Sequence, residues 1–224
     1  MKAEASVLSL LLGLAGCGSP PPAAPRGFVV PDEGRIVDLT RAASAGDPGT
    51  TIAVAQSVLQ LAPSRCLAPL YVVDLRDRAT LAPEFTFTAD DLDEYEARHG
   101  AIESGSCVVF ATGGVRRTRG TREQPARDVG PAISAGVIGL LARQRGAVGF
   151  GTDGVGIDPI GGAGSPALEA ALSAGAFVLT RLAPLSEVAD GRALLFMAPP
   201  LVREASAPVR VLALVARTVG RQSR

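Results

Sequence analysis

The chain has 224 residues, of which 47% are hydrophobic, and its 22 basic side chains balance its 22 acidic ones. A neutral chain without a basic run offers no electrostatic footprint for DNA or RNA, so no nucleic-acid partner is expected. The sequence also holds one histidine, three cysteines and no tryptophan, which leaves few side chains for acid–base chemistry or for binding a metal through nitrogen or sulfur.

The first element in chain order is an export signal over residues 1–16. Lys2 gives it a basic start, and the apolar stretch over 7–14 is far shorter than the roughly 20 residues of a membrane-spanning helix. The small residues before Cys17, in the run Leu14-Ala15-Gly16-Cys17, are typical of a lipoprotein signal. We therefore expect cleavage before Cys17 and lipidation of its thiol, which anchors an exported protein to a bacterial membrane, facing the periplasm or the cell exterior. The alternatives are a plain signal peptide that is removed without lipidation and a chance apolar start.

The segment 17–33, between the signal and the globular part, is predicted to be a tether. Residues 18–25 are rich in proline and alanine and have no apolar periodicity, which is typical of a semi-rigid spacer. Roughly 190 residues follow, enough for one domain with its own core. We place this domain at 34–217 and a polar tail at 218–224. Loss of 1–16 removes one lysine and one glutamate, so the mature chain stays neutral.

Strands alternate with helices along the predicted domain. Short β-branched runs predict strands, whereas caps such as Thr88 and Ser165-Pro166, with stops at Gly100 and Gly175, bound the predicted helices. The expected elements are strand 70–75, helix 88–98, strand 107–111, helix 133–143, strand 147–151, helix 165–175, strand 177–180, strand 193–197 and strand 208–215. Strand–helix–strand units imply parallel pairing, so we expect an α/β fold with a mixed, largely parallel sheet and an antiparallel addition at its end. Residues 50–61 fit either a helix or a strand.

Lipidation of Cys17 leaves Cys66 and Cys107 as a pair that could form a disulfide outside the cytoplasm. Both lie at the entrances to predicted strands, so they could be near each other. The sequence gives no Cα separation, so a disulfide and two free, buried thiols remain as alternatives.

Two motifs suggest nucleotide binding or serine hydrolysis but lack the context that either chemistry needs. Gly149 to Gly154 matches GxGxxG after a predicted strand, but no helix is expected to begin directly behind it. Ser134 lies in a near match to GxSxG, but no strand precedes it, and His99 is the one available base. His99 itself lies at a predicted helix C-terminus, where a structural or solvent-exposed role is expected.

Polar residues near the ends of predicted strands are the best candidates for a ligand pocket. Asp153 and Asp158 follow one strand and Thr112 ends another, and the carboxyl ends of strands in open α/β sheets usually border the ligand crevice. The alternative is that the aspartates shape a glycine-rich turn through bonds to the backbone. A nearby run of arginines is either a solvated loop or a site for an anion or a partner. Its members are Arg116, Arg117, Arg119, Arg122 and Arg127.

Seven stretches of the domain follow one another in a characteristic order. They are Ile36–Thr40, Tyr71–Asp74, Thr88–Leu92 with His99-Gly100, Thr112-Gly113, Val148–Asp153 with Ile157-Asp158, Ala198–Leu201, and Ala207–Arg210. Together they resemble the cyclase family of metal-dependent amide hydrolases, which includes kynurenine formamidase and isatin hydrolase. The resemblance implies the family's swivelling β/β/α domain, a zinc or manganese cofactor and assembly into a homo-oligomer.

The metal-binding parts of that family are missing from this sequence. The family's motif HxGTHxDxPxH has no counterpart, since residues 41–69 contain no histidine and Asp47-Pro48-Gly49-Thr50-Thr51, the nearest echo, supplies one carboxylate. The family also uses a histidine and, twelve residues later, a glutamate, and the aligned positions here hold Leu168 and Thr180. A catalytic zinc or manganese needs about three protein ligands. We therefore expect no metal cofactor, no metal ligand and no catalytic residue.

The sequence favours a membrane-tethered, non-catalytic domain on a hydrolase scaffold that binds a small-molecule ligand or a partner. Its pocket is expected at Thr112, Asp153, Asp158, Leu168 and Thr180. The alternative is a metal-dependent hydrolase of small amides, similar to the arylformamidase of the kynurenine pathway, with a remodelled site. A purely structural envelope lipoprotein is a third hypothesis.

Overall fold

Parallel strands form the centre of the sheet in this computed structural model, which describes residues 34–119, 127–188 and 193–215. They are β3 (Leu67–Asp74), β5 (Cys107–Ala111), β9 (Gly149–Thr152) and β10 (Phe177–Thr180), paired in that order. Every residue of β5 is buried, because apolar groups cover both faces of this strand, as is usual in parallel sheets.

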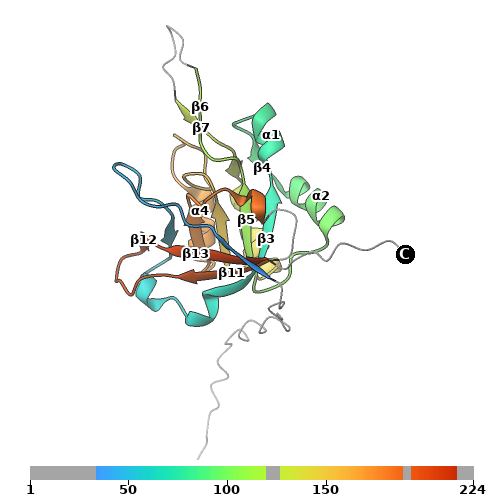
Figure 1. Cartoon of the computed structure of the whole chain (residues 1–224). Helices are drawn as coiled ribbons and strands as arrows, with labels where there is room; N and C mark the ends of the chain where they lie inside the picture. The colour runs from blue at the N-terminus through green and yellow to red at the C-terminus, as the bar shows by residue number, and fades with distance from the viewer. Residues whose placement is uncertain (1–33, 120–126, 189–192, 216–224) are drawn as a thin grey trace, which may run out of the picture.

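Antiparallel strands extend this centre on both sides (Figure 1). Next to β3 lie β11 (Ala193–Ala198), β13 (Arg210–Val215) and β1 (Arg35–Asp38), and next to β10 lie β2 (Thr51–Ala53) and β12 (Ser206–Pro208). The predicted mixed α/β architecture is confirmed. Parallel pairing is limited to the central strands, so the sheet is less parallel than the sequence suggested. The reason is that strands from both ends of the chain, β1 and β2 at the start and β11, β12 and β13 at the end, flank the parallel centre and pair antiparallel.

The sheet curls until its two edges approach each other. Only Val209 separates β12 from β13, yet these strands join opposite ends of the strand order. The Val209 amide donates to Thr50 O at 3.0 Å, and the Leu39 amide donates to Val211 O at 2.9 Å. The segment after β1 and the segment before β2 are therefore both hydrogen-bonded to residues 209–211. Both segments lie at the same end of the curled sheet.

Two hydrophobic cores lie on the two faces of the central strands. Along β5, Val109 faces the core inside the curl, while Val108 and Phe110 face the core beneath the helices. This division follows from the period-2 alternation of strand side chains. The helices that cover the second core are α2 (Ala89–His99), α3 (Ala135–Gln144) and α4 (Pro166–Ser173).

The helix boundaries follow the predicted caps closely. Thr88 precedes α2, where its amide donates to Asp91 Oδ2 at 2.8 Å, and Gly100 ends the helix with a φ of 86°. Ser134 is the N-cap of α3, since its hydroxyl accepts the Val137 amide at 3.3 Å. This cap explains the near match to GxSxG as a feature of local structure.

Several short elements were not expected from the sequence. They are helix α1 (Arg76–Leu81), the paired strands β4 (Thr86–Phe87) and β8 (Ala132–Ile133), the paired strands β6 (Arg116–Arg117) and β7 (Asp128–Val129), and 3-10 turns at Val58–Gln60, Pro63–Arg65 and Leu185–Glu187. The antiparallel pair of β6 and β7 projects from the body of the domain (Figure 1). The ambiguous segment 50–61 contains both β2 and a 3-10 turn.

Cys66 and Cys107 are both free thiols in the structure. Cys66 lies just before β3 and is half-buried, whereas Cys107 begins β5 and is fully buried. Burial raises the pKa of both thiols, because a low-dielectric environment disfavours the thiolate. The disulfide between Cys66 and Cys107 stays a prediction, and the two sulfur atoms are not bonded to each other in this structure.

The predicted signal, Cys17, the tether and the polar tail lie outside the described residues. Within the described ranges, no helix has both the length and the apolar composition that crossing a membrane requires.

Candidate functional site

A cleft of about 480 Å³ opens at the edge of the sheet where the central parallel strands end. Asp153 follows β9 and Arg181 follows β10, while Arg41 and Asp47 come from the loop between β1 and β2. The carboxyl ends of strands in α/β sheets are the usual place for a ligand crevice. The cleft therefore lies at the carboxyl ends of the strands, and of the five predicted pocket residues Asp153 lines it.

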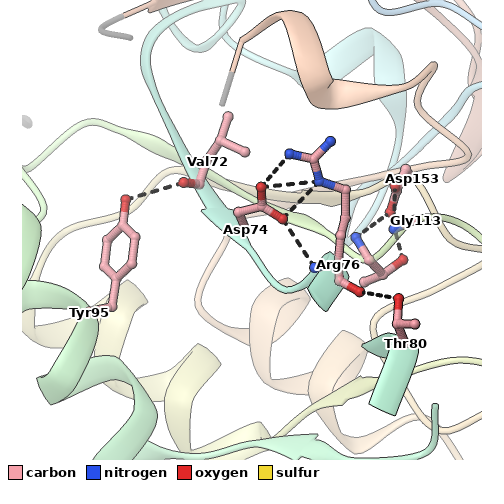
Figure 2. Close-up of polar contacts among 8 residues, drawn as sticks. Val72, Asp74, Arg76, Thr80, Tyr95, Gly113 and Asp153 are labelled. Atoms are coloured by element: carbon pink, nitrogen blue, oxygen red, sulfur yellow. Dashed lines mark hydrogen bonds and ion pairs between the residues drawn. The ribbon is translucent and has the colours of Figure 1, made fainter. Parts of the chain in front are cut away.

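Asp153 fixes the loops on the floor of this cleft. Its Oδ1 accepts the Thr112 amide at 2.8 Å and the Thr112 hydroxyl at 2.6 Å, and its Oδ2 accepts the Gly113 amide at 2.9 Å. Figure 2 shows the Asp153 carboxylate directed at the Gly113 amide. The Asp153 side chain is buried, with 6% of the residue exposed. Both of its oxygens are thus engaged by the protein itself.

A second aspartate at the same edge is paired with an arginine two residues later in the chain. Asp74, at the end of β3, accepts from Arg76 Nε at 2.9 Å and 3.1 Å and from the Arg76 amide at 3.0 Å (Figure 2). These bonds from Arg76 lower the pKa of Asp74 below its usual range. The first turn of α1 is fixed in this way beside the Asp153 loop.

Asp47 lies between two arginines in the cleft. Its Oδ2 is 3.6 Å from Arg41 Nη1, and its Oδ1 is 3.7 Å from Arg181 Nη1. Asp47 Oδ1 also accepts the Gly49 amide at 2.9 Å. The Gly49 amide and the nearby charges of Arg181 and Arg41 hold the pKa of Asp47 below its usual range.

The backbone around Asp47 is closely constrained. The Thr50 hydroxyl accepts the Arg41 amide at 2.7 Å and donates to Arg181 O at 2.7 Å, so it links the two arginine-bearing segments. Gly49 has a φ of 70°, and a Cβ there would lie 2.5 Å from Arg41 O. Only glycine fits this position. The Asp-Pro-Gly-Thr run therefore closes the loop that brings Arg41 beside Arg181.

The structure separates the residues that the sequence grouped into one pocket. Asp153 lines the cleft, whereas Thr112 is not a lining residue and donates its hydroxyl to Asp153. Asp158 accepts the amides of Ala167 at 2.7 Å and Leu168 at 3.0 Å, so it satisfies the first turn of α4. Asp158 therefore caps a helix, a role that differs from the glycine-rich turn named as the alternative in the sequence analysis.

Leu168 and Thr180 also lie outside the residues that line the cleft. Leu168 packs against the core beneath the helices, and the Thr180 hydroxyl is 2.8 Å from the Thr51 hydroxyl. Sequence reasoning missed Arg41 and Arg181. The one available signal for Arg181 was its place directly after the predicted strand 177–180.

The loop arginines mostly contact neighbouring side chains. Arg127 donates to both carboxylate oxygens of Glu84 at 2.8 Å and 2.7 Å, and Arg116 donates to the Thr80 hydroxyl at 2.8 Å. Arg117 lies 3.7 Å from Asp128. Arg122 lies outside the described residues. This arrangement agrees with a solvated loop.

The donors around the cleft do not fit zinc or manganese. Asp153 is fully engaged by hydrogen bonds, and Asp47 lies beside two cations that repel a divalent ion. His99 is exposed at the end of α2, where its ring stacks on Tyr95 at 4.4 Å. Across the part of the chain that the structure describes, no three His, Cys, Asp or Glu residues come together as a group that could hold a metal. A metal site needs such a group.

Comparisons with known proteins point to one family. Residues 41–159 match the Cyclase family model. Isatin hydrolase of Roseibium aggregatum is 32% identical over 163 residues, an alignment that covers 67% of this chain and 60% of that protein. The chain therefore matches less than two thirds of that relative's length.

Solved structures share the fold at low sequence identity. Isatin hydrolase A from Labrenzia aggregata, bound to benzyl benzoate, superposes with a TM-score of 0.70 at 22% identity over 81% of this chain and 94% of that one. Isatin hydrolase A from Ralstonia solanacearum gives 0.67 at 21% identity over 82% and 92%. A predicted metal-dependent hydrolase from Bacillus stearothermophilus gives 0.57 at 20% identity over 81% and 98%.

Proposed function

This chain belongs to the cyclase family, and from that premise we propose that it is a membrane-tethered member that binds a small molecule in its cleft without metal-dependent hydrolysis. The family fold provides the crevice, and the side chains in the crevice decide the chemistry.

The observation that carries this proposal is the set of side chains at the cleft. Two arginines stand beside Asp47, and Asp153 gives both oxygens to Thr112 and Gly113. At the positions aligned with the family's histidine and glutamate, Leu168 packs in a core and the Thr180 hydroxyl contacts Thr51. Metal-activated water requires an ion with several protein ligands and an open position, and these residues do not supply them.

The metal content and hydrolytic activity of the full-length protein test the proposal together. We expect less than stoichiometric zinc and manganese by mass spectrometry after purification. We also expect no hydrolysis of isatin or N-formylkynurenine above the uncatalysed rate, with or without added ions. A characterised isatin hydrolase assayed alongside serves as the positive control. A bound ion together with turnover contradicts the proposal.

The membrane tether rests on the sequence around Cys17 and has its own test. Cys17→Ala should move the protein from the membrane fraction to the soluble fraction and abolish incorporation of a labelled fatty acid. The matched control is Cys66→Ala, which removes a different thiol and should leave both measurements unchanged. Membrane association of Cys17→Ala equal to that of the unaltered protein contradicts lipidation.

The second candidate function is hydrolysis of small cyclic or linear amides by a remodelled metal site. The 32% identity with an isatin hydrolase favours it. It requires metal ligands other than those of the family motif, so the same metal and activity measurements separate it from the first proposal.

A further inference from the structure

The two arginines of the cleft keep most of their hydrogen-bonding capacity. Their distances to Asp47, 3.6 Å and 3.7 Å, exceed the range of N–H···O hydrogen bonds, so these contacts are charge pairs. A further contact of these guanidinium groups is a long hydrogen bond from Arg41 Nη2 to Asp153 O at 3.4 Å. Each guanidinium carries five donors, which leaves several for a ligand.

One carboxylate lies directly against these donors. Asp47 stands between Arg41 and Arg181, one anion beside two cations, whereas Asp153 is engaged by Thr112 and Gly113, and Asp128 lies 3.7 Å from Arg117. Because the cleft lining also contains the carboxylates of Asp153 and Asp128, hydrogen bonds from the two guanidinium groups, and not a surplus of positive charge, favour an anion there. The planar guanidinium fork matches the geometry of a carboxylate.

The cleft also offers apolar surface near these charges. Val115 and Val155 line it from the loops that follow β5 and β9, and each has 37% of its surface exposed. Exposed valines on the wall of a crevice favour a ligand with an apolar body. Together, the two arginines and the two valines describe an amphipathic ligand.

The position of Arg181 is built into the backbone. Its φ of 56° is left-handed, a conformation that is uncommon for a residue other than glycine. The Arg181 amide donates to Gly154 O at 2.8 Å, and its carbonyl accepts the Thr50 hydroxyl at 2.7 Å. Such strain persists only where the surrounding structure holds it, and it often marks a ligand site.

Building on the proposed ligand binding, we propose that the cleft binds a small apolar monocarboxylic acid whose carboxylate is held by Arg41 and Arg181. In the absence of a ligand, Asp47 interacts with both guanidinium groups and acts as an internal competitor. The ligand carboxylate replaces this loose contact with direct hydrogen bonds, while Asp47 keeps its bond from the Gly49 amide.

Calorimetric titration of the full-length protein with three probes tests the ligand class. Benzoate carries the charge and the apolar body, benzamide has the same shape without the charge, and inorganic phosphate carries charge without the apolar body. We expect a saturable benzoate isotherm, with benzamide and phosphate each bound at least about tenfold more weakly. Equal binding of benzamide, or tighter binding of phosphate, overturns the inference, as does the absence of benzoate binding to the folded protein.

Variants of the charged residues test the mechanism. Asp47→Asn keeps the side-chain shape and the acceptor for Gly49, and removal of the competing charge should raise benzoate affinity about tenfold. Arg181→Asn, which tolerates a left-handed φ, and Arg41→Gln should each lower it at least about tenfold. Glu84→Gln, an exposed carboxylate outside the cleft that pairs with Arg127, is the control and should change affinity less than about twofold.

The direction of the Asp47→Asn effect is decisive, because a purely structural role for Asp47 predicts weaker or unchanged binding. Either result overturns the inference that Asp47 competes with the ligand carboxylate, provided that circular dichroism shows that Asp47→Asn is folded. Unaltered affinity in both arginine variants overturns the carboxylate site. These outcomes are distinct from failure of the proposed function, which appears as bound metal with turnover and not as a change in benzoate binding.

Discussion

At the scale of single residues, Asp153 joins the two loops on the floor of the cleft. It is buried and accepts three hydrogen bonds from Thr112 and Gly113. Removal of a buried acceptor leaves its donors without partners, and each loss of this kind costs about 1–3 kcal/mol. The integrity of the cleft therefore depends strongly on one carboxylate.

We predict that Asp153→Ala lowers the free energy of unfolding by about 3 kcal/mol, because three donors lose their acceptor. Asp153→Asn should cost roughly 1 kcal/mol, since one oxygen remains for Thr112. Urea denaturation followed by circular dichroism measures both values. Asp128→Asn, an exposed carboxylate of the same cleft, should change stability by less than about 0.5 kcal/mol. Equal stability of Asp153→Ala and the unaltered protein contradicts this account.

At the scale of elements, the start of α4 is stabilised by a residue distant in sequence. Ser165 occupies the N-cap position, as predicted, but its side chain makes no capping bond there. Asp158 instead accepts the amides of Ala167 and Leu168. The carboxylate also interacts favourably with the positive end of the helix dipole.

Asp158→Ala should therefore lower the free energy of unfolding by about 1 kcal/mol, the usual cost of a lost cap. Hydrogen exchange of the α4 amides should accelerate more than exchange in α3. Ser165→Ala is the matched control and should have little effect on either measurement. A larger loss for Ser165→Ala than for Asp158→Ala reverses the assignment of the cap.

Helices α2 and α3 are joined by an ion pair that makes stability depend on pH. Arg145 Nε donates to Glu96 Oε1 at 2.9 Å, and Arg145 Nη2 donates to Glu96 Oε2 at 2.6 Å. These bonds from Arg145, with one from the Ile102 amide, lower the pKa of Glu96. A lowered carboxyl pKa contributes stability above the unfolded-state value, and that contribution is lost as pH falls through the folded-state value.

We predict that the stability lost between about pH 5 and about pH 3 is smaller in Glu96→Gln than in the unaltered protein, by roughly 1 kcal/mol. Urea denaturation at a series of pH values measures the difference. Glu94→Gln is the control on the same helix, because the Glu94–Arg98 pair is exposed at both ends and such pairs contribute little. Parallel pH profiles for Glu96→Gln and the unaltered protein contradict the prediction.

Elements with clear local signals could be predicted from the sequence. Strands β5 and β10 have the predicted bounds, because apolar runs end there at Thr112 and Arg181. Helix α1 was missed because its six residues are too few to show helical periodicity. The break between β12 and β13 could not be seen in the sequence, because only Val209 separates these strands. They nevertheless pair at different ends of the sheet.

The candidate site could be predicted only in part, because a sequence shows local position but not contacts between distant segments. Asp153 could be identified because it directly follows a strand, and local position is visible in a sequence. The approach of Arg41 to Arg181 depends on the curl of the sheet and on the Thr50 hydroxyl that links both backbones. Contacts of this kind arise from tertiary structure, so no local pattern announces them.

At the scale of the whole molecule, the curled sheet sets the cleft between its central strands and the loop after β1. A divalent metal site needs several converging ligands, and the described residues of this chain form no such group. Thermal stability reports this difference without any activity assay. An ion present at 100 times its Kd stabilises a folded protein by about 2.7 kcal/mol, which raises Tm by roughly 5–10 °C in a domain of this size.

We therefore predict that the Tm of the full-length protein is the same within about 1 °C in EDTA, in zinc and in manganese. The physical reason is that the arginines beside Asp47 and the engaged oxygens of Asp153 offer no favourable place for a divalent cation. Differential scanning calorimetry measures Tm, and a metal-dependent isatin hydrolase in the same buffers should show the shift. A rise of about 5 °C or more with either ion, reversed by EDTA, indicates a metal site that these residues do not provide.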